Sequence, residues 1–359
     1  MLCTTKIKLL TDSDQFNKLA ATMVRFNEAS NYISEVLFLE QIFSQIKAHK
    51  LCYYDVRERF GLSAQMAVRA IGKVVDSYKT DRTSKHTFRE TGAVVYDERI
   101  LSFKGLEYAS ILTLEGRIDV PMLISAYHQG VLQGRRVRGQ ADLILQDGLF
   151  YLLLVIEIPD GTPFEPEGVI GVDLGIANIA VDSTGEVFSG AKVNGIRARH
   201  RRLRKKLQAK GTKSAKRLLK KRRRKEQRFA RDVNHQISKR LVSKAKDTRS
   251  VIALEDLKGI RERTEKTVKK AQRAKHSSWA FYQLRQFIDY KAKLAGVFVM
   301  FVDPRNTSRT CPECGLIDKN NRPTRDTFRC QCCGYAAPAD NVAAINIGRR
   351  AAVNQPYAG

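Results

Sequence analysis

Three acidic residues stand where an isolated charge is costly unless it is paired or bound to a metal. Asp173 lies within an apolar, strand-like run, Glu255 ends a second such run, and Asp340 begins a predicted helix. Hard divalent ions prefer oxygen ligands. Two bridged ions can cut a phosphodiester, one by activating water and the other by stabilising the leaving oxygen. The three acids therefore predict ligands for two Mg²⁺ or Mn²⁺ ions in a metal-dependent nuclease.

Each acid also has a structural explanation. Acids at strand ends often cap the next turn, and Asp340 could be a helix N-cap that accepts backbone N–H bonds. The DLG sequence at 173–175 is also similar to the phosphate-binding hairpin of actin-like and sugar-kinase ATPases. Three further acids, namely Asp182 before a turn, Asp256 on the opposite side of its strand from Glu255, and Asp303 before a proline, are interpreted as structural.

Five of the seven cysteines lie in one short segment, while Cys3 and Cys52 stand alone. Two Cys-x-x-Cys pairs separated by fifteen residues are typical of a tetrahedral zinc site, and the predicted ligands are Cys311, Cys314, Cys330 and Cys333. A closed site of four thiolates predicts a structural Zn²⁺. Cys332 is expected to be a spare thiol. The alternative is a redox pair or a disulfide, but a glycine follows each pair, as in zinc-ribbon turns.

The chain is strongly basic, with 64 Lys and Arg against 37 Asp and Glu and a formal net charge of +27. Nucleic acid is the expected partner for such an excess. Residues 197–228 contain eighteen Lys or Arg and one acid, Glu226. The run could be a solvated face, but such a face normally carries acids as well. We therefore expect phosphate contacts from its basic side chains, with these candidates: Arg197, Arg201, Arg202, Arg204, Lys205, Lys206, Lys220, Lys221, Arg222, Arg223 and Arg224.

The spacing of apolar residues predicts the elements that carry these sites. Residues 169–182 and 186–190 read as two strands of a hairpin, and basic helices broken near Gly211 follow. A buried strand contains Glu255, residues 261–278 are polar, an amphipathic helix covers 278–296, and a strand covers 297–304. Trp279, Phe281 and Tyr282 are interpreted as core on that helix. The cysteine segment and a final helix over 339–353 complete this half.

The first half reads differently. Residues 4–10 alternate like a strand, and 12–84 show helical spacing, with Ser63 as a predicted cap. From 92 to 160 the chain shows short apolar runs between turn signals, which predict an antiparallel barrel or sandwich. The first strand is expected to join that sheet, which would make the helical block an insertion. The sequence has neither a long apolar segment nor a signal peptide, and this predicts a soluble, cytoplasmic protein.

Four motifs in a fixed order carry a resemblance to a known family. They are GVDLGIANIAV, VIALEDLKG, TSRTCPECG and ADNVAAINI. With them the chain resembles the TnpB family of transposon-encoded, RNA-guided nucleases, which is related to type V CRISPR effectors. The resemblance implies that Asp173, Glu255 and Asp340 are catalytic. One residue departs from the family pattern: Val342 stands where the last motif usually has Asn, with Asn341 beside it.

The resemblance also implies an architecture. It predicts a wedge-type antiparallel β-barrel over 1–11 and 85–165 and a helical recognition domain over 12–84. It further predicts an RNase H-like, RuvC-like α/β nuclease domain over 166–302 and 338–359, with basic helices at 192–246. A zinc ribbon that binds target nucleic acid would occupy 303–337.

The activity implied is RNA-guided cleavage of double-stranded DNA next to a short flanking motif, in a prokaryotic cell and at the nucleoid when bound to DNA. The guide RNA would come from the transposon's own end, and one copy of the chain would bind one RNA. The alternatives are an RNA-guided DNA-binding regulator that does not cut, a compact type V CRISPR effector, and a nuclease that processes its own transcript.

Overall fold

The computed structural model describes residues 1–135, 137–222, 225–256 and 281–353. These residues form two compact units, Met1–Pro159 and Asp160–Gly359. No helix among them is long and apolar enough to cross a membrane. The polar segment predicted at 261–278 lies outside the described residues, as do Trp279, Arg223 and Arg224.

The first unit is built on a seven-stranded antiparallel sheet that curls into a nearly closed barrel, in the order β2-β6-β7-β1-β5-β4-β3. Its strands are β1 (Leu2–Leu9), β2 (Val94–Tyr96), β3 (Leu101–Lys104), β4 (Tyr108–Thr113), β5 (Gly116–Leu123), β6 (Val137–Gln146) and β7 (Leu149–Glu157). The first strand pairs with β7 and β5, as the sequence predicted. The alternating apolar residues of β7 face the core.

Three helices follow β1 before the sheet resumes at β2, namely α1 (Ser13–Leu39), α2 (Gln45–Phe60) and α3 (Ala64–Tyr78). The Ser63 hydroxyl accepts a hydrogen bond from the Met66 N–H at 3.4 Å, so the predicted cap of α3 is confirmed. The apolar face predicted for this helix is buried from Met66 to Val75. A short helix, α4 (Ala126–Leu132), precedes β6.

The sequence prediction missed β5, because the apolar runs between 92 and 160 that read as strands are 93–97, 100–104, 109–114, 141–146 and 149–158. This strand contains Asp119 and Pro121, and proline within an apolar run argues against a strand because it donates no ladder bond. Pro121 is tolerated because its carbonyl still accepts a bond from Leu10 N–H at 2.8 Å, while its side chain stands opposite Tyr108 on β4. The pairing partner, and not the local pattern, specifies this strand.

The second unit contains a five-stranded mixed sheet in the order β10-β9-β8-β11-β12. Its strands are β8 (Gly168–Asp173), β9 (Asn178–Asp182), β10 (Val187–Ser189), β11 (Ser250–Glu255) and β12 (Val299–Val302). The strands β8, β11 and β12 are parallel, whereas β9 runs antiparallel to both β8 and β10. The carboxyl ends of β8 and β11 therefore lie at the same edge of the sheet.

The prediction of one long strand over 169–182 was wrong, because the segment forms two strands. The chain turns at 174–177, between β8 and β9. The Gly175 N–H donates to the Ile179 carbonyl at 3.3 Å, and a Cβ on Gly175 would come within 2.7 Å of the Asn178 carbonyl oxygen. A glycine is therefore required where the backbone folds back so closely.

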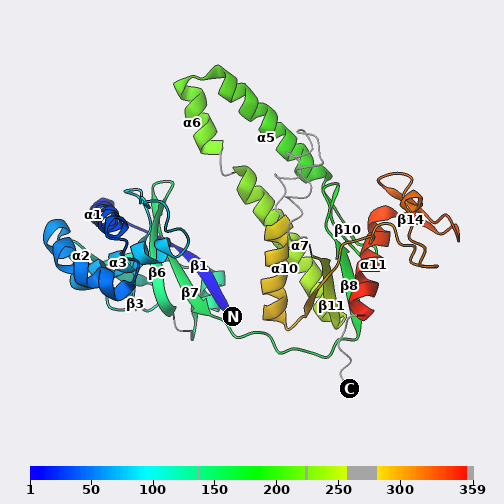
Figure 1. Ribbon diagram of the computed structural model, residues 1–359, viewed down its shortest axis with the longest axis horizontal. Coiled ribbons are helices and arrows are strands. Elements are labelled where there is room, and N and C mark those ends of the chain that lie inside the picture. Colours follow the sequence, from blue (N-terminus) through cyan, green and yellow to red (C-terminus); the bar gives the residue numbers. More distant parts are fainter. Residues whose placement is uncertain (136, 223–224, 257–280, 354–359) are drawn as a thin grey trace. The chain divides into compact units, whose positions relative to one another are not determined.

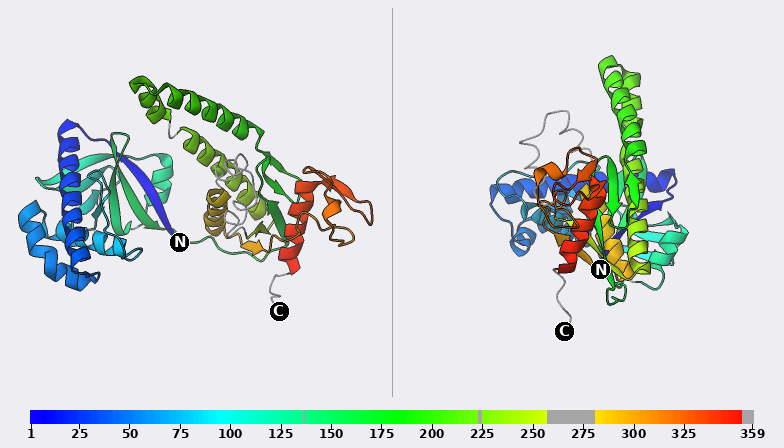
Figure 2. Two further views of the ribbon diagram at one scale, coloured as in Figure 1. Left: turned by 45° about the horizontal axis from the view of Figure 1, so that its top comes forward. Right: turned by 90° about the vertical axis from the view of Figure 1, so that its right-hand side faces the viewer.

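Helices cover the second sheet and extend from it (Figures 1 and 2). They are α5 (Ala191–Lys210), α6 (Lys213–Arg222), α7 (Lys225–Asp247), α10 (Phe281–Ala295) and α11 (Ala339–Val353). The predicted break between basic helices is confirmed, since Gly211 ends α5 with φ of +63°. The interpretation of Tyr282 as core was wrong, because 68% of this residue is exposed. Leu284 fills the core from the neighbouring turn instead.

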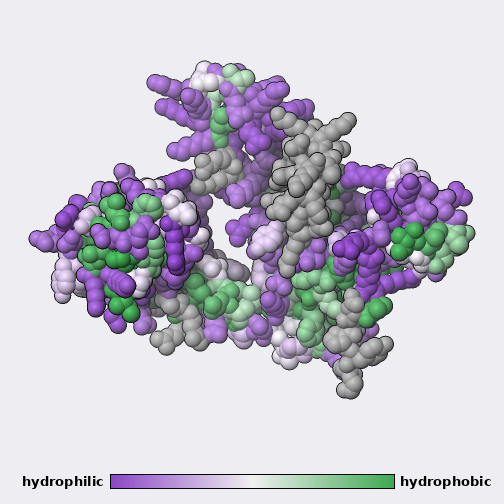
Figure 3. All heavy atoms as spheres, in the orientation of Figure 1, coloured by the Kyte–Doolittle hydropathy of each residue, from purple (hydrophilic) through white to green (hydrophobic). Residues whose placement is uncertain are grey.

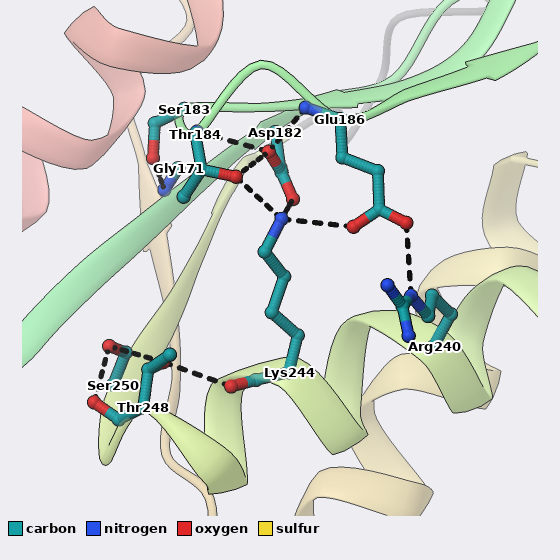
Figure 4. A network of polar contacts seen from close by, with 9 residues as sticks. All are labelled: Gly171, Asp182, Ser183, Thr184, Glu186, Arg240, Lys244, Thr248 and Ser250. Carbon is teal, nitrogen blue, oxygen red and sulfur yellow. Dashed lines mark hydrogen bonds and ion pairs between the residues drawn. The ribbon is translucent and has the colours of Figure 1, made fainter.

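A polar network attaches α7 to the β9–β10 hairpin (Figure 4). Asp182 is fully buried, and its carboxylate accepts bonds from the Lys244 ammonium, the Thr184 hydroxyl and the Glu186 N–H. Although burial opposes it, these bonds hold the pKa of Asp182 below its usual value. Asp182 is thus structural, as the sequence suggested.

The helix α11 packs directly on β8 at two glycines. A Cβ on Gly171 would overlap the carbonyl oxygen of Ala344 and the backbone nitrogen of Gly348. Gly348 in turn faces the Gly171 backbone, since its own Cβ would lie 3.2 Å from the Gly171 nitrogen. This close approach sets the distance between β8, which ends in Asp173, and the helix that begins beside Asp340.

Candidate functional site

Two of the predicted acids end neighbouring parallel strands. The register pairs Val172 on β8 with Leu254 on β11, so the next residues, Asp173 and Glu255, stand side by side. Asp340 lies in the first turn of α11, the helix that packs on β8. All three side chains are partly buried. The fold therefore gathers three acids, the outermost of which, Asp173 and Asp340, are 167 residues apart in the sequence.

Each acid has a specific polar neighbour. The Thr307 hydroxyl lies 2.6 Å from Glu255 Oε1, and the Asn178 amide donates to Asp340 Oδ2 at 3.0 Å. The Arg322 guanidinium lies 3.6 Å from Asp340 Oδ1. The sequence analysis missed these three neighbours. Their roles have no local signal, because each partner lies between 18 and 162 residues away.

The electrostatics of the acids follow from burial and mutual repulsion. Burial raises the pKa of Asp173 to about 7, and the charges of Glu255 and Asp340 add to the effect, while Arg322 opposes it. Burial also raises the pKa of Glu255, against the hydrogen bond with Thr307. A site that holds like charges together in this way is relieved by a bound cation.

The chemistry of this donor set fits hard divalent ions, since it consists of carboxylate oxygens. Among the described residues, however, only the cysteine set is drawn together tightly enough for one ion. The three carboxylates do not form such a group in the described structure. Carboxylates in two-metal sites hold two ions about 3.5–4 Å apart.

The four predicted cysteine ligands converge on one point. Their sulfur atoms all lie within 4.8 Å of one another. The Sγ atoms of Cys311 and Cys333 are 3.5 Å apart, and those of Cys314 and Cys330 are 3.4 Å apart. Zn–S bonds of about 2.3 Å in a tetrahedron require similar spacings. Cys332 is exposed and stands outside the set.

The cysteine set belongs to a small unit between β12 and α11. It contains a one-turn 3-10 helix, η1 (Lys319–Asn321), and the strands β13 (Thr327–Arg329) and β14 (Ala336–Pro338). Val342, the departure from the family pattern, is fully buried on α11 against Cys311, Phe328 and Cys330. At this position the side chain is therefore an apolar contact between the helix and the cysteine unit.

The basic candidates lie on α5 and α6, where hydrophilic side chains cover the surface (Figure 3). Seven are exposed: Arg201, Arg202, Arg204, Lys205, Lys206, Lys220 and Lys221. Arg197 and Arg222 are half-buried, and an Arg222 nitrogen lies 3.4 Å from His200 Nδ1, which links the two helices. The side chains of seven described candidates are thus accessible to the phosphates of a nucleic acid.

Comparisons with known proteins agree with the motifs. Residues 154–261, which include Asp173 and Glu255, match the family model described as "Probable transposase". Residues 281–347, which include the four cysteines and Asp340, match the model "Cas12f1-like, TNB domain". The two models together cover the regions that carry the candidate site.

Several curated proteins are similar in sequence. The CRISPR-associated endodeoxyribonuclease Cas12f1 of Sulfoacidibacillus thermotolerans is 40% identical over 33% of this chain and 26% of its own length. The TnpB-like protein MJ0751 of Methanocaldococcus jannaschii is 37% identical over 35% and 44%. The putative RNA-guided DNA endonuclease InsQ of Escherichia coli is 31% identical over 56% and 53%. The chain thus spans about half or less of the length of these relatives.

Two solved structures are similar in fold. One is the Cas12f1 protein in a complex with sgRNA and target DNA, with a TM-score of 0.62 at 14% identity over 97% of this chain and 98% of that one. The other is the mini-RNA-guided endonuclease CRISPR-Cas_phi3, with a TM-score of 0.59 at 11% identity over 100% and 93%. These structures show a similar fold. The sequence matches confirm the resemblance: the chain is related to the TnpB and Cas12f proteins.

Proposed function

We propose that this chain is an RNA-guided DNA endonuclease that cuts with Asp173, Glu255 and Asp340. One observation carries the proposal: the parallel register of β8 and β11 puts two acids side by side, and Asp340 adds to the raised pKa of Asp173. Perturbed acids gathered at one edge of a sheet are typical of active sites. The names of the relatives, an endodeoxyribonuclease and a putative RNA-guided DNA endonuclease, support DNA as the substrate.

The proposal includes the domain assignment made from the sequence. Residues 166–302 and 338–359 would form an RNase H-like, RuvC-like domain, an assignment supported by a mixed sheet whose three parallel strands adjoin an antiparallel hairpin. Residues 303–337 would be its inserted zinc ribbon. The barrel over 1–11 and 85–165 would be the wedge domain, and 12–84 the recognition domain.

In the proposed mechanism, the three carboxylates would hold two Mg²⁺ or Mn²⁺ ions. When bound, such ions supply water activation and stabilisation of the leaving oxygen. The protein's own groups orient the ligands: Asn178 holds one oxygen of Asp340, and Arg322 brings a positive charge beside it. Because Arg322 lowers the pKa of Asp173, it favours the ionised carboxylate that cation binding requires.

The nucleic acids would be held mainly by charge. The exposed Lys and Arg of α5 and α6 would contact phosphates, which gives affinity without sequence readout. Specificity would come from pairing between target DNA and a guide RNA made from the transposon end. The four cysteines would hold a structural Zn²⁺ that stabilises the ribbon.

The test uses the protein purified together with RNA from cells that carry its flanking DNA. Sequencing should find one discrete, structured RNA with a variable 3′ end, and random cellular RNA would contradict the proposal. Matched double-stranded DNA with a library of flanking sequences is then incubated with Mg²⁺. We expect cleavage by the native complex and none by Asp173→Ala with RNA still bound. Intact DNA at full binding would instead support a regulator that does not cut.

A further inference from the structure

A buried polar link joins Glu255 to the helix that carries Asp340. Thr307 is 3% exposed, and its hydroxyl lies 2.6 Å from Glu255 Oε1 and 3.1 Å from the Pro304 carbonyl. Asn346 on α11 is 5% exposed, and its amide donates to the Thr307 carbonyl at 2.8 Å and to the Thr310 carbonyl at 2.7 Å. The link therefore connects β11, the segment before the cysteine unit, and α11.

We infer that Thr307 and Asn346 are positioning residues for the cleavage site, an inference that rests on the proposed function. Thr307 would fix the direction of the Glu255 carboxylate. Asn346 would fix the Thr307 segment to the helix that begins beside Asp340. Glu255 on β11 and Asp340 on α11 would thereby keep a constant distance and orientation relative to each other.

Glu255 needs such a fixed orientation more than Asp173 does. A glutamate side chain has one more rotatable bond than an aspartate, so holding it in one conformation costs more entropy. A hydrogen bond from a buried neighbour reduces the number of conformations, and hydrogen-bonded ligating carboxylates are a general feature of metal sites. Thr307 is the side chain whose hydroxyl contacts the Glu255 carboxylate in the described part of the chain.

Asn346 is suited to its place by its two amide protons. Each proton goes to a different backbone carbonyl, and both carbonyls lie in the turn at 307–310. The residue after Thr310 is Cys311, the first predicted zinc ligand. Asn346 on α11 thus holds the turn that contains Thr307, the partner of Glu255, and that leads directly into the cysteine unit.

The test compares four variants of the full-length, zinc-loaded complex with its RNA, three of them at Thr307 and Thr310 and one at Asn346. Thr307→Val keeps the shape and removes the hydroxyl, and Thr307→Ser restores the hydroxyl. Thr310→Val is the matched control, because the Thr310 hydroxyl bonds only the Asn306 carbonyl, at 2.8 Å, in the described structure. The measurements are the cleavage rate of matched DNA, Mn²⁺ binding by electron paramagnetic resonance, zinc content and melting temperature.

Removing the Thr307 hydroxyl should lower both cleavage and Mn²⁺ affinity about 10- to 100-fold, as is typical for groups that orient metal ligands. Thr307→Ser and Thr310→Val should stay close to the native values, and zinc content should not change. Asn346→Asp, which keeps the size and removes both donors, should lower Mn²⁺ affinity together with the melting temperature. If Asn346→Asp fails to fold, the comparison of Thr307→Val with Thr307→Ser tests the inference without it.

The inference is overturned by native Mn²⁺ binding in Thr307→Val, or by equal losses in Thr307→Val and Thr307→Ser. The inference would also be overturned if Thr307→Val changed only the melting temperature, by the same amount as Thr310→Val. That result would show a purely structural role for Thr307. Failure of the native complex to cut matched DNA would contradict the proposed function instead. In that case the Mn²⁺ measurements on the Thr307 pair still test the positioning role.

Discussion

The carboxylate site and the cysteine set differ in how the chain builds them. The four cysteines come from one segment of 23 residues, and their sulfur atoms converge within 4.8 Å. The three acids come from two strands and a helix, and they meet only when the sheet and α11 have formed. The cysteine set is a local structure, whereas the carboxylate site depends on the whole second unit.

The difference predicts opposite energetic roles. A closed set of thiolates gains folding free energy when a metal binds, because the small unit around it has few buried apolar residues of its own. The acids instead cost folding free energy when they are ionised, because burial, and to a lesser extent the charges of Glu255 and Asp340, raise the pKa of Asp173. The cysteine set should therefore contribute to the stability of the fold, and the carboxylate site should contribute to cleavage.

The largest effect is expected from Asp173→Asn. Cleavage should fall below about 1% of the native rate, a larger loss than the 10- to 100-fold typical of outer groups, because a metal-binding oxygen is replaced by an amide nitrogen. Zinc content and RNA binding should not change. The matched control is Asp256→Asn at the residue that follows β11, whose carboxylate pairs with Arg285 at 3.0 Å. Equal cleavage rates in Asp173→Asn and Asp256→Asn would show that Asp173 is not part of the cleavage site.

Cys311→Ser should affect both regions. Cys311 is 1% exposed and packs in the core of the cysteine unit, so losing zinc should unfold that unit. Cleavage should fall strongly as well, because Arg322 and the Thr307 segment belong to the same stretch of chain. Zinc content and cleavage are measured beside Cys332→Ser, whose exposed thiol lies outside the set. A zinc-free variant with native cleavage would show that the two sites are independent.

Gly171→Ala should separate the acids without touching one. The added Cβ would overlap the backbone of α11, so that helix and Asp340 must move away from β8. A displacement of about 1 Å can cost on the order of 100-fold in rate. Gly168→Ala on the same strand is the control, since its Cβ would meet only Ser250 Oγ, at 3.3 Å. The account would be contradicted if cleavage by Gly171→Ala matched that of Gly168→Ala.

A smaller effect concerns stability and pH. The pKa of Asp173 is raised from 3.8 to about 7 in the folded protein. Protonated Asp173 therefore makes its full contribution to the stability of the folded protein below about pH 4. This contribution is lost as the pH rises through 7. In magnesium-free, zinc-loaded protein, the free energy of unfolding should thus fall by on the order of 2–4 kcal/mol over this range, relative to Asp173→Asn. The same pH dependence of the free energy of unfolding in the native protein and in Asp173→Asn would contradict the raised pKa of Asp173.

Local patterns were enough to predict much of this architecture. The strand ending at Glu255, the cap at Ser63 and the cysteine spacing could be predicted from neighbouring residues alone. The end of β8 at Asp173 could not, because the turn at 174–177 interrupts a continuous apolar run. The errors arose where tertiary structure decides. Strand β5 tolerates Pro121 because of its pairing with β4, and the polar neighbours of the acids, such as Arg322, become visible only when distant segments meet.

We propose that Asp173, Glu255 and Asp340 form one site for divalent ions, separate from the four cysteines. Mn²⁺ binding tests this, followed by electron paramagnetic resonance in the zinc-loaded complex with RNA and a phosphorothioate-linked matched DNA. The native complex should bind two Mn²⁺ ions, and Asp173→Ala should lose them while its zinc content stays unchanged. Equal Mn²⁺ binding by the native complex and by Asp173→Ala would contradict it.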